Sequence, residues 1–210
     1  MYQAVVFDID GTVVDSHFLM NAARDAYLDI RGTNLPEEIF WVLYGSPVKD
    51  HQQIMGLSNE EYAHFNECFQ LHLPKYIGQQ RIYDGIKETM QALKKMGMIL
   101  AINTSRTKQA TLDASRSMEW DFAAYCDYIM SSDQVRRPKP APDSLFLLCE
   151  MACVYPQEVL FIGDTDFDSI CASRAGADFA LATWGAAELH PAKYYPSKPT
   201  DLIDIVKYHR

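Results

Sequence analysis

The sequence contains no hydrophobic run long enough to cross a membrane. A transmembrane helix needs about 18 to 20 consecutive apolar residues, and no stretch of the 210-residue chain approaches that length. The first residues also lack the basic start of a secretory signal peptide, and the chain becomes acidic at Asp8. We therefore expect no membrane partner.

The sequence also lacks the cysteine spacing of a disulfide or zinc scaffold. Its five cysteines form an odd, scattered set without a Cys-x-x-Cys pair. Disulfide-rich domains and zinc ribbons need paired cysteines at short spacings. The set therefore predicts reduced thiols and a cytoplasmic protein.

A basic stripe, an internal repeat and a low-complexity tract are missing as well. The 28 acidic residues outnumber the 19 basic ones, which gives a net charge of -9. Nucleic-acid-binding proteins usually carry a basic patch or stripe, so we expect no nucleic-acid partner. An acidic protein can still bind a phosphate ester where a metal ion, a lysine or backbone N–H groups help locally. Composition leaves the oligomeric state open.

The pattern that is present is one of short buried strands alternating with helices. β-branched and aromatic runs typical of strands buried on both faces occur at residues 4–7, 98–103, 128–130, 159–162 and 179–182. Helical patterns occur between or after them, at residues 85–96, 107–118, 142–152 and 168–175. This alternation predicts an α/β fold, with a Rossmann-like parallel sheet and helices on both faces. Right-handed crossovers then bring the carboxyl ends of the strands to one edge, where such sheets bind ligands.

One long segment interrupts this alternation. Residues 15–80 contain no convincing strand and show helical patterns at residues 18–30, 36–44, 48–55 and 59–76. A helical insertion directly after the first strand suggests a cap over the carboxyl edge of the sheet. We therefore predict a catalytic core formed by residues 1–14 and 81–210, and an inserted helical cap domain formed by residues 15–80.

The first strand is followed directly by the segment DIDGT, residues 8–12. Its carboxylates, Asp8 and Asp10, lie two residues apart, where they can share one metal ion or one reacting phosphate. Gly11 allows the backbone to turn sharply beside a ligand. Taken alone, the segment also fits a strand that ends in an ordinary Asp-Gly turn.

Polar residues follow three further strands. Thr104 and Ser105 follow the second strand where we expect a helix to begin, so their hydroxyl and N–H groups can hold phosphoryl oxygens. Lys139 lies between two prolines in a loop after the third strand. Asp164 and Asp168 follow the fourth strand in an acidic run that is costly without a cation or a helix N-terminus nearby. Each segment alone also fits a helix cap or a solvated loop.

Together, these segments resemble the four motifs of the haloacid-dehalogenase-like (HAD) superfamily, in the same order. The similar segments are DIDGTVVDS at 8–16, KPAPD at 139–143, FIGDTDFD at 161–168 and AGA at 175–177. The resemblance is to the phosphatase branch with a helical cap after the first motif, which includes phosphoglycolate phosphatases. It covers essentially the whole core, and over the cap it is only architectural.

The resemblance implies a magnesium-dependent phosphomonoester hydrolase. Asp8 resembles the nucleophile that forms an aspartyl-phosphate. Asp10 resembles the general acid, which protonates the departing alkoxide and then deprotonates the attacking water. Since that role needs a proton at neutral pH, we expect burial and nearby carboxylates to raise the pKa of Asp10. An aspartate at this position also favours phosphate esters over the halogenated substrates of dehalogenases.

The same resemblance assigns the binding groups. Thr104 and the N–H of Ser105 are expected to bind phosphoryl oxygens, and Lys139 to neutralise charge in the transition state.

Mg²⁺ is expected as the cofactor, bound by Asp8, the backbone carbonyl of Asp10 and Asp164, because all-oxygen ligands suit this ion. Asp168 is expected to orient Lys139 or a metal-bound water.

Two alternative functions remain open. A sugar-phosphate mutase of the β-phosphoglucomutase kind shares both aspartates and the cap, but carries a histidine twelve residues after the nucleophile. This chain has Met20 there, with His17 nearby. A non-catalytic ligand-binding regulator on the same fold would be expected to lose Asp8, Asp10 or Lys139.

The substrate is expected to be a small phosphate ester chosen by the cap. Phosphoglycolate, a sugar phosphate, a nucleoside monophosphate and pyrophosphate all remain open. The polar candidates, of which Lys49 is favoured, are His17, Arg24, Arg31, Lys49 and His51. The cap aromatics are expected to form its apolar core rather than a substrate platform; they include Phe18, Phe40, Trp41 and Tyr44.

Overall fold

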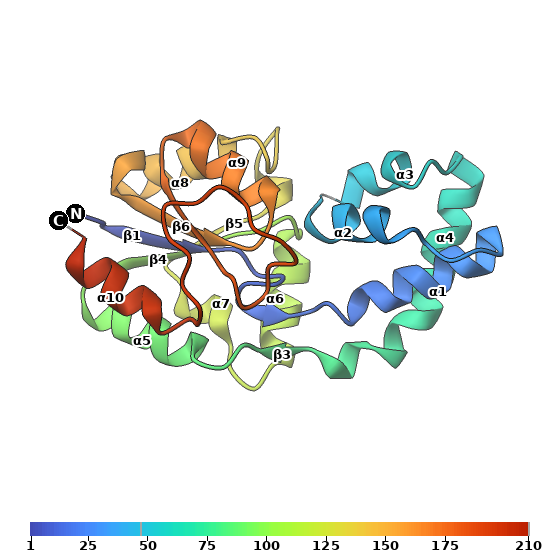
Figure 1. Ribbon diagram of the computed structural model, residues 1–210, viewed down its shortest axis with the longest axis horizontal. Helices are drawn as coiled ribbons and strands as arrows, with labels where there is room; N and C mark the ends of the chain where they lie inside the picture. The colour runs from blue at the N-terminus through green and yellow to red at the C-terminus, as the bar shows by residue number, and fades with distance from the viewer. Residues whose placement is uncertain (47, 210) are drawn as a thin grey trace.

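The computed structural model describes residues 1–46 and 48–209. An α/β core lies on one side, and a group of helices between β2 and β3 lies beside it (Figure 1). This confirms the predicted α/β class. Within the described residues, every helix is too short or too polar to reach across a bilayer.

The core is built on a five-stranded parallel sheet with the strand order β5-β4-β1-β6-β7. The strands are β1 (Ala4–Phe7), β4 (Ile99–Asn103), β5 (Tyr128–Met130), β6 (Val159–Gly163) and β7 (Asp178–Leu181). In the central strand, Phe7 is the register partner of both Ile102 and Ile162. Because the three central strands run in register, their carboxyl ends meet at one edge, which faces the helical group (Figure 1).

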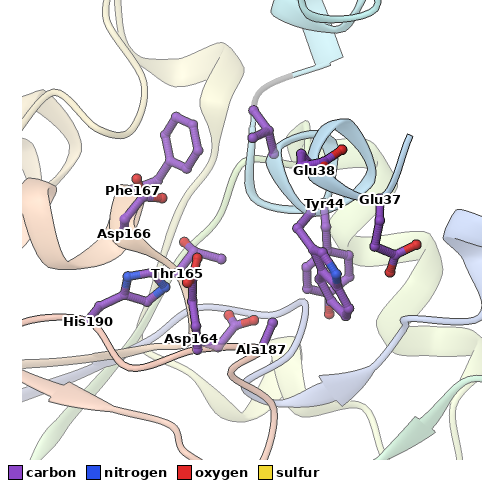
Figure 2. A pocket seen from close by; sticks show the side chains of 12 residues that line it. Glu37, Glu38, Tyr44, Asp164, Thr165, Asp166, Phe167, Ala187 and His190 are labelled. Carbon is purple, nitrogen blue, oxygen red and sulfur yellow. The ribbon is translucent and has the colours of Figure 1, made fainter. Parts of the chain in front are cut away.

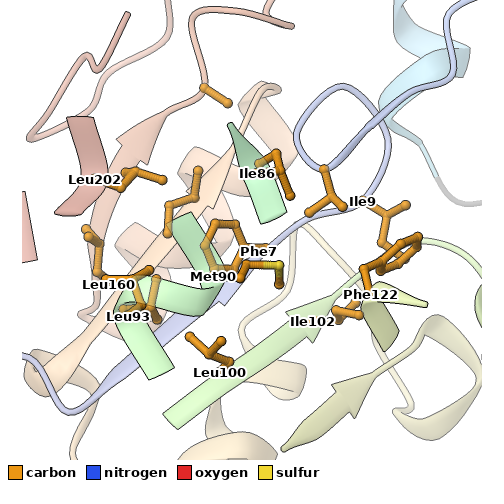
Figure 3. Close-up of a cluster of buried hydrophobic side chains, with 14 of the residues drawn as sticks. Phe7, Ile9, Ile86, Met90, Leu93, Leu100, Ile102, Phe122, Leu160 and Leu202 are labelled. Atoms are coloured by element: carbon orange, nitrogen blue, oxygen red, sulfur yellow. The ribbon is translucent and has the colours of Figure 1, made fainter. Parts of the chain in front are cut away.

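Alternate side chains of each strand cover opposite faces of the sheet. Val5 and Phe7 of β1 join one buried cluster, and Ala4 and Val6 join the other. The first cluster (Figure 3) packs under α5 (Ile86–Lys95), α7 (Phe122–Tyr125) and α10 (Asp201–Tyr208). The second packs under α8 (Asp143–Ala152) and α9 (Asp166–Ala175). Both faces are therefore covered, as a parallel sheet requires.

The helices between β2 and β3 have an apolar cluster of their own. It is formed by α1 (Leu19–Arg31), α2 (Glu37–Gly45), α3 (His51–Ile54) and α4 (Asn59–His72), and we call these four helices the cap. Phe40, Leu43 and Phe65 are buried at its centre. The cap thus buries its own apolar residues and lies beside the carboxyl edge of the sheet (Figure 1).

The cap differs in two places from the helical patterns expected there. The helix expected at 48–55 is a 3₁₀ turn, Val48–Asp50, followed by α3. The helix expected at 59–76 ends at His72 and continues as a 3₁₀ turn, Leu73–Lys75. Pro74 explains the second difference, because a proline has no N–H to continue the hydrogen bonds of an α-helix.

A two-stranded antiparallel ribbon joins the cap to the core, and the sequence pattern did not predict it. It pairs β2 (Val14–Asp15) with β3 (Arg81–Ile82). The guanidinium of Arg81 lies 3.1 Å from the carboxylate of Asp15. Strands of two residues are too short to show alternation. The ribbon holds the two linkers of the cap side by side.

Core packing predicts the effect of truncating Leu100, which is completely buried in the first cluster. Leu100→Ala should lower the free energy of unfolding by about 2 to 5 kcal/mol, because it removes buried apolar surface and leaves a cavity. Urea unfolding followed by circular dichroism measures this change. Leu71→Ala is the matched control, since Leu71 is 76% exposed; equal losses in both variants would contradict the assignment of the core.

Candidate active site

Four of the expected site residues come together at the carboxyl edge of the sheet. Asp8 follows β1, Thr104 follows β4, Asp164 follows β6, and Lys139 lies in the loop that precedes α8. Each of the four side chains is at least nine-tenths buried. Parallel strands in register therefore gather polar groups from four distant parts of the chain.

Lys139 lies between two carboxylates. Its ammonium donates to Oδ1 of Asp8 at 2.8 Å and to Oδ1 of Asp168 at 2.6 Å. Burial alone would lower the pKa of Lys139, but the charges of Asp168 and Asp8 outweigh it and raise the pKa. The lysine is therefore a fixed positive charge at neutral pH.

Asp168 is held from both sides. Its second oxygen, Oδ2, accepts hydrogen bonds from the N–H and hydroxyl of Thr165, at 3.1 and 2.7 Å, in the first turn of α9. With Oδ1 on Lys139, both oxygens of the carboxylate are engaged. This geometry suits a residue that orients Lys139 better than one that binds a metal ion directly.

The site contains more negative charge than Lys139 balances. Carboxylate oxygens of Asp8, Asp164 and Asp168 lie within 4.8 Å of one another, and all three side chains are buried. Burial raises the pKa of Asp8 to about 7, with Lys139 opposing the rise and Asp168 and Asp10 adding to it. Burial, Asp168 and Asp8 raise the pKa of Asp164 well above its ordinary value.

This surplus charge fits a divalent cation. Buried carboxylates repel one another unless protons or a cation neutralise them. The donor set consists of oxygen atoms, which suits Mg²⁺ rather than a softer metal. Since both oxygens of Asp168 are already engaged, Asp8 and Asp164 are the side chains best placed to hold the ion.

Gly11 is required where the first loop passes under Asp164. Its φ of +73° lies in the left-handed region, and a Cβ atom there would overlap the Asp164 carboxylate. The next residue, Thr12, donates from its hydroxyl to Oδ1 of Asp164 at 3.3 Å. The Asp-Gly-Thr sequence thus provides both the turn and the space that Asp164 occupies.

Asp10 departs from the expectation that its pKa is raised. Arg106 binds its carboxylate through two nitrogens, with Nε 2.8 Å from Oδ2, and the hydroxyl of Ser16 donates to Oδ1. Burial alone would raise the pKa of Asp10, but the charge and hydrogen bonds of Arg106 and the bond from Ser16 lower it. The expectation is therefore wrong for this conformation, and the physical reason is a bidentate guanidinium.

Thr104 lies in a loop rather than at the start of a helix. Its hydroxyl oxygen accepts from the backbone N–H of Arg106 at 3.2 Å, and its own N–H donates to Met130 at 2.9 Å. The following helix, α6 (Lys108–Ser117), has Thr107 as its N-cap, three residues further along. Phosphoryl oxygens held by Thr104 and Ser105 would therefore contact a loop, and not the end of α6.

The sequence reasoning missed a loop that packs on the first motif. After β7, the indole of Trp184 donates to the carbonyl of Thr12 at 2.9 Å. A Cβ atom on Gly185 would overlap the carbonyl oxygen of Gly11. No sequence pattern connects these residues to the first motif. The only sign in the sequence of a close approach between two backbones is an isolated glycine.

A cavity of about 650 Å³ lies between the core site and the cap (Figure 2). Asp164 and Thr165 form its core side, and Trp41 and Tyr44 of α2 form part of its cap side. The expectation that both aromatics belong to the apolar core of the cap is wrong, although it holds for Phe40.

Tyr44 fixes this wall at the junction of cap and core. Its ring stacks on the imidazole of His17, with ring centres 4.6 Å apart. Its hydroxyl lies 3.4 Å from the hydroxyl of Ser16. Ser16 in turn binds Asp10, so the cavity wall is connected to the loop that follows β1.

Most of the polar cap candidates are engaged within the cap. Arg24 lies 2.6 Å from Glu37, Arg31 lies 2.8 Å from Glu61, and the imidazole of His51 lies 3.2 Å from a backbone carbonyl. Lys49 instead lines a separate groove of about 310 Å³, together with Ser105, Thr107 and Arg136. Lys49 therefore faces the core, but outside the cavity that contains Asp164.

Comparison with known proteins gives consistent results. The family model described as haloacid dehalogenase-like hydrolase matches residues 5–182. The phosphoglycolate phosphatase of Aquifex aeolicus (strain VF5) is 27% identical, with 99% of this chain and 98% of that protein covered. The phosphoglycolate phosphatase of Mannheimia succiniciproducens is 26% identical, with 98% and 97% covered. Among solved structures, a predicted phosphoglycolate phosphatase from Haemophilus somnus 129PT has a TM-score of 0.85 at 23% identity, with 98% of both chains covered.

The ion pair on Asp10 leads to a prediction for the metal-free protein. Arg106→Met should raise the pKa of Asp10, because burial then acts without the opposing guanidinium. Carboxyl ¹³C NMR titration measures the shift. Arg137→Met is the matched control, since Arg137 pairs with Asp143 at the surface, and it should leave Asp10 unchanged. An unchanged or lower pKa of Asp10 in Arg106→Met would contradict the assignment.

Proposed function

Because the chain belongs to the haloacid dehalogenase-like hydrolase family and is a phosphatase, we propose that it hydrolyses a small phosphate monoester through the Asp8 carboxylate, with Mg²⁺ as cofactor. The observation that carries the proposal is the position of Lys139. It donates to both Asp8 and Asp168. Their carboxylates lie within 4.8 Å of that of Asp164, which lines a cavity of about 650 Å³.

In the first step, an oxygen of Asp8 attacks phosphorus and the bond from phosphorus to the leaving alcohol oxygen breaks. In the second step, water attacks the aspartyl-phosphate, which releases inorganic phosphate and restores the carboxylate. Lys139 donates to Oδ1 of Asp8, so its charge offsets the repulsion between a carboxylate and an anionic ester. Thr104 and Ser105 would hold the phosphoryl oxygens.

The proposed metal ligands are the carboxylates of Asp8 and Asp164 and the backbone carbonyl of Asp10. When bound, Mg²⁺ would supply positive charge that offsets the phosphoryl oxygens and the crowded carboxylates. Asp168 would act through Lys139, which it holds at 2.6 Å.

Asp10 would act as the acid and base, but Arg106 occupies its carboxylate in this conformation. Guanidinium groups bind phosphate in the same bidentate manner as carboxylate. We infer that the phosphoryl oxygens of a substrate draw Arg106 away from Asp10 before proton transfer. Arg106 then serves two successive partners, the carboxylate in the free enzyme and the substrate in the complex.

The mutase alternative gains no support from the cap. Met20, at the position of the mutase histidine, packs against the apolar cluster of the cap and offers no acid or base. The matched relatives that are named phosphoglycolate phosphatases favour release of phosphate from a small ester. We therefore propose hydrolysis, in the cytoplasm, of a small phosphorylated metabolite such as phosphoglycolate, a sugar phosphate or a nucleotide.

The role of Asp8 predicts the effect of replacing it. Asp8→Asn should lower phosphate release by at least about 10³-fold, because an amide does not form the acyl-phosphate. Asp143→Asn, at the surface beside Arg137, is the matched control and should keep its activity. Beryllofluoride should bind to the carboxylate of Asp8 in the wild-type protein and should not bind in Asp8→Asn. Wild-type rates in Asp8→Asn would rule out the proposed mechanism.

The carboxylate cluster predicts metal dependence. EDTA should abolish phosphate release and added Mg²⁺ should restore it, because the uncompensated charge at Asp8 and Asp164 needs a cation. Asp164→Asn should raise the Mg²⁺ concentration for half-maximal activity by about tenfold or more, whereas Asp143→Asn should leave it unchanged. Full activity in EDTA would exclude the metal site.

A further inference from the structure

The cavity above Asp164 is lined by carboxylates that the reaction scheme does not use. Glu37 and Glu38 come from the start of α2, Asp166 from the start of α9, and Glu188 from the loop after β7. In Figure 2, Asp166 lies on one side of the cavity and Glu37 and Glu38 on the other. Among the described residues of the cavity wall, His190 is the only basic side chain.

All four of these residues are exposed, and three of them have no ion-pair partner among the described residues. Glu37 is neutralised by Arg24 at 2.6 Å. Within residues 1–46 and 48–209, no ion pair involves Glu38, Asp166 or Glu188. The wall of the cavity beside Asp164 is therefore rich in negative charge, although every substrate of a phosphatase is itself an anion.

The same cavity is lined by aromatic side chains. Trp41 and Tyr44 come from α2 of the cap and Phe167 from α9 of the core. Trp41 is 37% exposed, a high fraction for a tryptophan on a helix that also packs into the apolar cluster of the cap. Aromatic rings combined with carboxylates form the kind of site that binds alkylammonium groups, through attraction of the cation to the ring faces.

Two further cations at the junction of cap and core line a different hollow, apart from Arg106, which binds Asp10. Lys49 and Arg136 line the separate groove beside Ser105, and neither lines the cavity above Asp164. A leaving group that extends from the phosphorus into the cavity would thus meet negative and aromatic side chains. A carboxylate such as that of glycolate would be repelled there, and an ammonium would be attracted.

We propose that the leaving group of the preferred substrate is a cationic amino alcohol, so that the substrate class is an alkylammonium-alcohol phosphate monoester. This inference rests on the proposed function and uses the same reaction. Water supplies the hydroxyl that ends on phosphorus, the phosphorus–oxygen bond to the alcohol breaks, and the alcohol oxygen takes the proton. The ammonium remains unchanged in the cavity.

The test compares esters that differ in charge, with the Mg²⁺-loaded full-length protein. Phosphocholine carries the cation, 3,3-dimethylbutyl phosphate is its neutral carbon isostere, and phosphoglycolate carries an anion. Phosphocholine should show a kcat/KM about tenfold above that of the isostere, and phosphoglycolate should be the poorest. The preference should shrink as KCl is raised, because exposed charges are screened by salt.

Substitutions in the cavity wall test whether the cavity causes this preference. Glu38→Gln and Glu188→Gln should each lower the ratio of kcat/KM for phosphocholine to that for the isostere by several-fold. Trp41→Leu should lower the same ratio by removing the ring face. Glu150→Gln is the matched control, since Glu150 is exposed on α8, and it should leave the ratio unchanged.

The outcomes separate this inference from the proposed function. Equal rates for phosphocholine and its isostere, or a preference for phosphoglycolate, would overturn the inference, and the second result would place the leaving group in the groove of Lys49 and Arg136. If the wild-type protein hydrolyses p-nitrophenyl phosphate and Asp8→Asn does not, the proposed function stands in both cases. Failure to hydrolyse any of the four esters would instead overturn both.

Discussion

The structure depends on one buried ammonium that is shared by two carboxylates. Lys139 donates to Asp8 at 2.8 Å and to Asp168 at 2.6 Å, so it joins the end of β1 and the first turn of α9 to the loop before α8. Removing one partner of such a pair would leave an uncompensated buried charge, which is strongly destabilising. The three clustered carboxylates of Asp8, Asp164 and Asp168 outnumber this one ammonium, so the cluster is suited to a divalent cation.

Residues around Lys139 fix the positions of the neighbouring side chains and of the cap. Gly11 gives Asp164 its space, Thr165 orients Asp168, and Tyr44 connects the cap to the loop of Asp10 through Ser16. The core thus holds the carboxylate cluster in place, and the cap supplies part of the cavity wall beside Asp164.

The sequence predicted the fold and the meeting of Asp8, Thr104 and Asp164, because a parallel topology alone brings strand ends to one edge. It could not predict the contact between Arg106 and Asp10, which depends on how one long side chain folds back. It also misplaced Trp41, since residues 39–44 of α2 are all apolar or aromatic and their pattern does not show which face meets the cap cluster. The ribbon of β2 and β3 is too short to leave a pattern.

That ribbon has a consequence for how such enzymes diversify. Asp15 and Arg81 are register partners in an antiparallel pair, so the chain leaves and re-enters the core at a spacing that a two-residue hairpin turn can close. In its connection to the core, the whole insertion is equivalent to one surface loop. Long insertions in surface loops have a small entropic cost. Modules of different size can therefore be exchanged at this point without moving the register of β1.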